Sequence, residues 1–351
     1  MRRWTRSAAV VVVVSSLVLA GCSRREDTEQ ASSDELCPAG GDGPKIGLAY
    51  DVGGRGDDSF NDLAAKGVSD AVEALDATCT ELEAAAEESE SAREERLRTL
   101  ADAGHDPIIG VGAAYATSAA TVAAEYPDLT FGVVDGFTEA PNLTNLTFAA
   151  QQGAYLVGMA AALETETDNI GFVGGANNPV ITTFLAGYQA GARSINPDIE
   201  IQTQYLSDEL DDTAFSNVPG GRTAAEAMYD NGADVVFHAA GESGNGVFQA
   251  ADESDNWAIG VDSDQWLGAP EEQQDNILTS SLKRVDVAVL DFVRAFDEGT
   301  VEPGFELYDA ARDGVGYATS GGHVDEYTDQ LDEALAGIIA GEIEVPSEPT
   351  S

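Results

Sequence analysis

Short apolar runs alternate with helical segments from residue 45 onward, and this alternation limits the possible folds more than any other feature of the chain. Five runs come first, at residues 45–50, 79–84, 107–111, 130–134 and 145–149. The pattern then starts again, with runs at residues 169–173, 199–205, 234–238, 257–261 and 277–281. Alternating strands and helices predict a parallel sheet with helices on both faces. Two such series in roughly 300 residues predict an α/β protein of two lobes, each a doubly wound, mostly parallel sheet.

The restart of the pattern after residue 150 sets the expected lobe boundaries. We assign residues 45–150 and about 284–300 to lobe 1, and residues 151–283 and about 301–341 to lobe 2. Residues 342–351 are polar and indicate a loose tail. Helices are expected at residues 62–75, 113–125, 151–163, 180–195, 221–231, 285–296 and 326–340, and two more short strands at 305–308 and 315–318.

The N-terminus indicates export. An arginine-rich start precedes an apolar stretch at residues 8–20, which is too short to span ~30 Å of hydrocarbon as a helix. It fits the apolar region of a signal peptide over residues 1–21. The stretch ends in the letters LAGC, similar to a bacterial lipobox, so Cys22 is the expected lipidated residue. Residues 22–44 then indicate a flexible polar tether. A signal-anchor with a chance cysteine is the alternative, and both Tat and Sec export stay open.

Two further cysteines remain after Cys22. Cys37 lies just before the first apolar run and Cys79 opens the second, so an exported chain can join them in a disulfide. Two separate thiols are the alternative. The chain has no CxxC motif and its three histidines are scattered, which argues against a zinc site. No cofactor is expected.

The charge balance indicates a halophilic, archaeal-like protein. The chain has 63 Asp and Glu against 17 Lys and Arg, with a formal net charge of −46, while its hydrophobic fraction of 43% is sufficient for a core. At ~1 M salt the screening length falls to about 3 Å. Because charges then act only over such short distances, the protein must recognise its ligand through short-range contacts inside a cleft. A mesophilic acidic protein is the alternative.

Polar residues stand where the apolar runs of both lobes end. In open α/β sheets, ligands bind outside the carboxyl ends of the strands. The first lobe places Asp51 and Asp135 there, and the second places Gly241, Asp262 and Lys283. Any one aspartate can instead cap the next helix. Three such aspartates with one of the few lysines predict a polar cleft between the lobes.

Several blocks of sequence, in this order and spacing, resemble the basic membrane protein (BMP) family of lipoproteins over residues 45–320. The blocks are KIGLAYDVGGRGDDSFND, IIGVGAAYATSAATVAAEYPDLTFGVVDG, NLTFAAQQGAYLVGMAAAL, IGFVGGANNPVITTFLAGYQAGA and GADVVFHAAGESGNGVFQAA, followed by AIGVDSDQ and ILTSSLKR. The resemblance implies a two-lobed periplasmic binding protein of type I. It also implies a purine nucleoside receptor that serves an ABC transporter.

The resemblance implies how a nucleobase would be held. Phe60 and Phe215 would stack on its two faces, a contact worth ~1–3 kcal/mol per base. Asn61 would offer a donor and an acceptor to the base edge, and Asp51 would accept from a ring N–H or an amine. Tyr205 is an alternative match for Phe215, because the acidic segment at residues 206–214 is longer than the family's usual link.

The same resemblance implies how a ribose would be held. Asp262 and Asp135 would accept hydrogen bonds from its hydroxyl groups and Lys283 would donate one to its oxygens, while Gly241 lets the backbone approach the sugar. The segment GESGNG lacks the GK[ST] ending of a phosphate loop, and no basic cluster suits a phosphate. We therefore expect a neutral nucleoside rather than a nucleotide.

We expect a lipid-anchored, non-enzymatic monomer on the extracytoplasmic face of the membrane. Its partners would be an ABC permease and ATPase, with no nucleic acid. A sensory receptor is the alternative, followed by a nucleoside hydrolase, although GxSxG and HExxH motifs are absent. The exact ligand, including other aromatic compounds such as riboflavin, stays open. Glycosylation of Asn142 or Asn145 also stays open.

Overall fold

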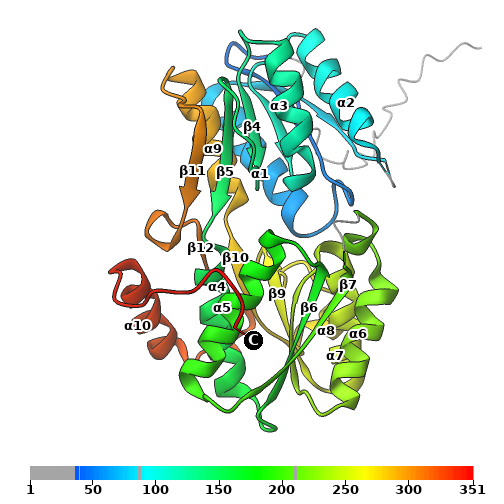
Figure 1. Cartoon of the computed structure of the whole chain (residues 1–351), viewed down its shortest axis with the longest axis vertical. Helices are drawn as coiled ribbons and strands as arrows, with labels where there is room; N and C mark the ends of the chain where they lie inside the picture. The colour runs from blue at the N-terminus through cyan, green and yellow to red at the C-terminus, as the bar shows by residue number, and fades with distance from the viewer. Residues whose placement is uncertain (1–35, 39, 86–87, 209–211, 351) are drawn as a thin grey trace, which may run out of the picture. The chain divides into compact units, whose positions relative to one another are not determined.

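Two six-stranded sheets make up the fold in the computed structural model, which describes residues 36–38, 40–85, 88–208 and 212–350 (Figure 1). The first has the strand order β11-β5-β4-β3-β1-β2, with every neighbouring pair parallel. Its strands are β1 (Lys45–Ala49), β2 (Thr78–Leu82), β3 (Ile108–Val111), β4 (Phe131–Val134), β5 (Leu143–Phe148) and β11 (Gly304–Tyr308).

The second sheet repeats this design with the order β12-β10-β9-β8-β6-β7. Only the β10–β12 pair is antiparallel. Its strands are β6 (Asn169–Ala176), β7 (Glu200–Ser207), β8 (Val235–Ala239), β9 (Trp257–Asp262), β10 (Ile277–Lys283) and β12 (Val315–Tyr317). The predicted α/β fold with two mostly parallel sheets is confirmed.

Helices cover both faces of each sheet. In lobe 1, α1 and α9 pack on one face and α2 and α3 on the other. In lobe 2, α4, α5 and α10 cover one face and α6 and α7 the other. The helices are α1 (Phe60–Leu75), α2 (Glu90–Asp102), α3 (Ala116–Glu125), α4 (Ala150–Glu164), α5 (Pro179–Ile195), α6 (Val218–Asp230), α7 (Gly244–Ser254), α8 (Glu271–Gln274), α9 (Val285–Asp297) and α10 (Thr328–Ile339), with short 3-10 turns at η1 (Ala113–Tyr115), η2 (Asp212–Phe215), η3 (Gly241–Ser243), η4 (Ala310–Arg312) and η5 (Ser320–Gly322).

Strand alternation explains why both faces of a sheet need helices. Ile46 and Leu48 of β1 point into the cluster under α1 and α9, whereas Ala49 points into the cluster under α2 and α3. Successive side chains of a strand face opposite sides. A strand that is apolar on both sides must therefore be covered twice, as in a doubly wound sheet.

The predicted place of β11 is wrong. We assigned residues from about 301 onward to lobe 2, but Gly304–Tyr308 pairs in parallel with β5 of the first sheet. The chain reaches this sheet because α9 packs against α1, and Asn145 then fastens the start of β11 by donating from Nδ2 to the Gly304 carbonyl over 3.1 Å. β12 returns to the second sheet.

The tether and tail boundaries are also wrong. Leu36 and Cys37 pack on the core of lobe 1, and a disulfide joins Cys37 to Cys79. The Gly43 N–H donates to the Asp76 carbonyl at 2.9 Å, so the fold begins before residue 44. Glycine is required at position 43, since a Cβ there would lie 2.1 Å from the Leu75 carbonyl oxygen.

At the other end of the chain, the expected loose tail lies along α5. The Thr350 N–H donates to Gln189 Oε1 over 3.0 Å, and Ile343 and Val345 pack on the core of lobe 2. The predicted signal peptide and Cys22 lie outside the described residues. In the described part of the chain, we find no helix with the length and apolar character that crossing a bilayer requires.

Candidate functional site

One pocket collects strand ends from both sheets. It is lined at the carboxyl ends of β1, β3 and β4 in the first sheet and of β6, β8, β9 and β10 in the second. Its space is about 860 Å³ when the open solvent at its mouth is included. All eight residues predicted to bind ligand line it: Asp51, Phe60, Asn61, Asp135, Phe215, Gly241, Asp262 and Lys283.

Asp57 organises the entrance of α1, which carries Phe60. Its carboxylate accepts from the backbone N–H groups of Ser59 at 3.0 Å, Asn61 at 2.8 Å and Asp62 at 3.1 Å. Burial raises the pKa of Asp57, and these N–H donors act against that rise. Asp57 therefore takes over capping from Ser59, the residue at the cap position, whose side chain makes no cap hydrogen bond.

Ser59 instead contacts the other lobe. Its hydroxyl donates to Asp262 Oδ2 at 3.2 Å and to the Val261 carbonyl at 3.3 Å.

Asp57 was not among the residues predicted to form the site. The signal for it is an aspartate just before a helix start, which is a common capping pattern.

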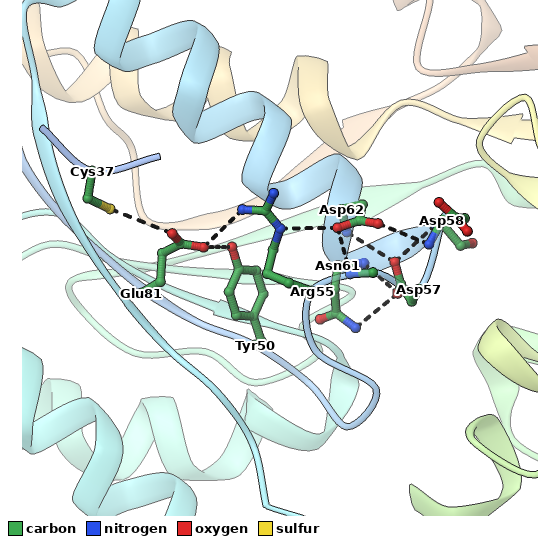
Figure 2. Close-up of polar contacts among 10 residues, drawn as sticks. Cys37, Tyr50, Arg55, Asp57, Asp58, Asn61, Asp62 and Glu81 are labelled. Carbon is green, nitrogen blue, oxygen red and sulfur yellow. Dashed lines mark hydrogen bonds and ion pairs between the residues drawn. The ribbon is translucent and has the colours of Figure 1, made fainter. Parts of the chain in front are cut away.

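The amide of Asn61 is partly occupied within the protein. Nδ2 donates to Asp57 Oδ2 at 3.0 Å, and Oδ1 accepts from the Asp51 N–H at 3.0 Å (Figure 2 shows the Asp57 contacts). Asn61 was predicted to offer both a donor and an acceptor to a base edge. The structure uses one N–H and one oxygen lone pair of this amide within the protein, which leaves one donor and one acceptor position for a ligand.

Lys283 lies among the polar residues that line the pocket, and its side chain is only 2% exposed. Its Nζ is 2.5 Å from Asp135 Oδ2, across the two lobes. It is also 4.9 Å from the ring centroid of Phe60, 5.0 Å from that of Phe148 and 5.8 Å from that of Phe184. A carboxylate and three ring faces thus stabilise this buried ammonium.

Asp262 is an acid of the pocket whose pKa is strongly raised. Burial raises its pKa to about 6, and the neighbouring Asp135 and Asp57 carboxylates add to the rise. Lys283 and the Ser59 hydroxyl lower it. Asp262 and Asp135 both adopt left-handed backbone, with φ of 64° and 59°, at the ends of β9 and β4. Aspartate tolerates this conformation better than most residues do.

Three aromatic rings line the pocket, from Phe60, Phe215 and Phe184. The Phe215 ring fits where Gly175 has no side chain, since a Cβ there would lie 2.4 Å from the ring. Tyr205, the alternative match, packs against Phe172 and does not line the pocket. Sequence analysis missed Phe184, because one apolar residue on a helix face resembles any other core residue.

The lining is strongly acidic. It contains the carboxylates of Asp51, Asp57, Asp135, Glu242 and Asp262, and among the described residues that line it Lys283 is the one cation. Nowhere in the described ranges do three or more His, Cys, Asp or Glu side chains form a group suited to a metal ion. The arrangement disfavours an anionic ligand and suits one with several N–H or O–H donors and a flat ring.

The sequence is similar to known substrate-binding proteins. The Bmp family model, described as "ABC transporter substrate-binding protein PnrA-like", matches residues 45–349. The chain is 32% identical to the "ABC transporter nucleoside-binding protein BmpA" of Lactococcus lactis subsp. cremoris, over 99% of this chain and 100% of that one. It is 33% identical to "Basic membrane protein A" of Borreliella burgdorferi, over 97% and 96% of the two chains.

Among solved structures, an ABC transporter solute-binding protein from Aeropyrum pernix K1 is similar. It has a TM-score of 0.74 and 27% sequence identity, and the match covers 86% of this chain and 94% of that one.

Proposed function

Because this chain belongs to the Bmp family of PnrA-like ABC transporter substrate-binding proteins, we propose that it captures a purine nucleoside for import. One observation carries the proposal. Aromatic rings and hydrogen-bonding groups from both lobes converge on one pocket. The nucleoside-binding name of the Lactococcus relative supports the choice of ligand.

The base would lie between Phe60 of lobe 1 and Phe215 of lobe 2. Stacking contributes ~1–3 kcal/mol per base and depends little on salt, because it acts at short range. Asp51 would accept a hydrogen bond from an N–H group on the base edge. Asn61 would hold Asp51 in place, because its Oδ1 accepts a hydrogen bond of 3.0 Å from the Asp51 backbone N–H. Phe184 would complete the apolar wall.

The ribose would lie at Asp262, Asp135 and Lys283. Ionised Asp262 suits hydroxyl donors, and Lys283 is positioned as a donor by Asp135. Five carboxylates face one ammonium in the lining, so a phosphate would be repelled. This charge balance supports a nucleoside over a nucleotide.

The family's role implies an extracytoplasmic, membrane-associated location. We further propose that a lipid on Cys22 provides the attachment. The test is Cys22→Ser in the native host, followed by separation of membranes. We expect the variant to appear in the soluble fraction, and full retention on membranes would contradict the proposal and support a signal-anchor.

The ligand is tested first by mass spectrometry of small molecules that co-purify with native protein. Calorimetric titration in about 1 M salt then compares inosine and guanosine with inosine 5′-monophosphate and cytidine. We expect the purine nucleosides to bind and the monophosphate to bind far more weakly. Failure of every nucleoside to bind would overturn the proposal.

A turnover assay separates a receptor from an enzyme. The protein is incubated with inosine, and free hypoxanthine is measured by chromatography. We expect none to form, because the family is one of substrate-binding proteins. Steady release of the base would instead support a nucleoside hydrolase.

A further inference from the structure

The glycine-rich segment at residues 52–58 has an unusual backbone. Gly53, Gly54 and Gly56 have φ of 102°, 61° and 90°, and Asp58 has φ of 50°. Glycine loses more conformational freedom than any other residue when it is fixed. Yet this segment joins Asp51 to Asp57, both of which line the pocket. The bonds of Asp57 and Asn61 hold part of it from within the pocket, and further contacts hold it from outside.

Arg55 supplies two such contacts. Its Nε is 3.1 Å from Asp62 Oδ1, in the first turn of α1, and one terminal nitrogen is 3.2 Å from Glu81 Oε2, on the edge strand β2. Figure 2 shows the guanidinium between these two carboxylates. None of the three residues lines the pocket.

Asp62 also holds the backbone of the same segment. Oδ1 accepts from the Gly56 N–H at 3.0 Å. Oδ2 accepts from the Asp58 N–H at 3.0 Å, a contact that Figure 2 shows. One carboxylate thus engages Arg55 and two backbone donors of residues 52–58. Hydrogen bonds to an ionised acceptor are roughly twice as strong as neutral ones.

Glu81 connects Arg55 to the other end of the segment. It accepts a short hydrogen bond from the hydroxyl of Tyr50, a fully buried residue that directly precedes Asp51. The Tyr50 carbonyl in turn accepts from the Tyr115 hydroxyl at 3.0 Å. Cys37 Sγ lies 3.9 Å from Glu81 Oε1, and this is a packing contact because a disulfide sulfur carries no proton.

We infer that Arg55, with Asp62 and Glu81, forms a bracket that positions the ligand-binding residues at both ends of segment 52–58. This inference rests on the proposed function. The bracket orders the segment before a ligand arrives, so less conformational entropy is lost on binding. Arg55 is a positioning residue, since it acts through Asp51 and Asp57 and lies outside the pocket itself.

The test compares Arg55→Gln, Arg55→Lys and the control Arg98→Gln. Arg98 is matched because it also bridges two carboxylates, Glu94 and Glu125, each at 2.8 Å, but belongs to α2 and does not line the pocket. With inosine as the probe, we expect Arg55→Gln to raise Kd about tenfold, as expected when preorganisation is lost. Arg55→Lys keeps the positive charge but loses the planar guanidinium that reaches two carboxylates at once. We therefore expect a smaller rise in Kd than for Arg55→Gln.

A second readout needs no ligand. Hydrogen exchange at the Gly56 and Asp58 amides should accelerate in Arg55→Gln and stay at the wild-type rate in Arg98→Gln. Faster exchange with unchanged affinity, or weaker binding with unchanged exchange, would overturn the inference. If wild-type protein does not bind inosine, the proposed function fails, while the exchange measurement still shows whether Arg55 orders the segment.

Discussion

Asp262 combines requirements for binding and for stability that oppose each other. An ionised carboxylate is the best acceptor for a hydrogen bond from a ribose hydroxyl. The Asp262 carboxyl, however, is buried and its pKa is raised to about 6. Lys283 and Ser59 offset only part of the cost of ionising it. When Asp262 is ionised, its buried negative charge therefore lowers the stability of the folded protein. Such destabilising charges are common at functional sites.

Asp262→Asn should stabilise the free protein above pH 6. Well below pH 4 the carboxyl is protonated in both the folded and the unfolded chain, so aspartate and asparagine contribute alike. Between about pH 4 and pH 6 the unfolded chain loses this proton while the buried carboxyl of the folded chain keeps it, so the wild-type protein loses stability as the pH rises, and the loss is complete above about pH 6. We expect the variant to gain about 1–3 kcal/mol in the free energy of unfolding at pH 7. Denaturation from pH 4 to 8 measures this, and a constant difference across that range would contradict it.

Phe60→Ala should weaken inosine binding about 5- to 150-fold, because a stacking contact of ~1–3 kcal/mol is lost. Phe305→Ala is the control, since Phe305 is 55% exposed on β11 and does not line the pocket. Titration calorimetry measures both. An unchanged affinity in Phe60→Ala would remove Phe60 from the site.

The connection from β1 to α1 shows how one element is built for a ligand. Asp57 caps the first turn of α1, although Ser59 occupies the cap position. The Ser59 side chain is therefore free to contact Asp262 across the cleft. The same carboxylate fixes the side chain of Asn61. One helix start thus sets the positions of Phe60, Asn61 and Ser59 together.

Asp57→Ala should destabilise the protein by about 1–2 kcal/mol, the usual range for a lost cap. Ser89→Ala is the matched control, because Ser89 caps α2 through one long bond of 3.3 Å. We expect the control to lose less, since Asp57 accepts three backbone donors. Urea unfolding gives both values, and equal losses would show that Asp57 is an ordinary cap.

Contacts between the lobes converge on the pocket. Lys283 pairs with Asp135, Ser59 donates to Asp262, and the Ser263 hydroxyl donates to the Asp58 carbonyl at 2.5 Å. Ligand binding by hinge closure would require the lobes to make and break such contacts. Three of these six residues, Lys283, Asp135 and Asp262, are also proposed to hold the ligand.

Lys283→Met should weaken inosine binding more than hypoxanthine binding, because the ammonium is proposed to face the ribose. Lys66→Met is the control, since Lys66 pairs with Asp70 on the surface of α1. Titration calorimetry with both ligands measures the difference. Equal losses for nucleoside and base would contradict a role at the sugar and leave Lys283 as a link between the lobes.

Much of the fold and site followed from local pattern. The alternation of strands and helices, the aspartates at strand ends and an aromatic at a helix start are all visible within a few residues, and each has one strongly favoured structure. Because parallel strands gather their carboxyl ends at one edge, these residues were expected to meet. The pocket lining contains every one of them.

Other features depended on contacts between residues distant in sequence. Strand β11 joins the first sheet because α9 brings it beside β5, and its own five residues carry no signal for either sheet. Phe184 lines the pocket and Phe148 faces Lys283 only because the lobes meet there. The sequence by itself determined which groups this protein offers a ligand. The tertiary structure decided which of them face the pocket and which are already bonded within the protein, because partners such as Asp57 and Asn61, or Lys283 and Asp135, are chosen by packing in three dimensions.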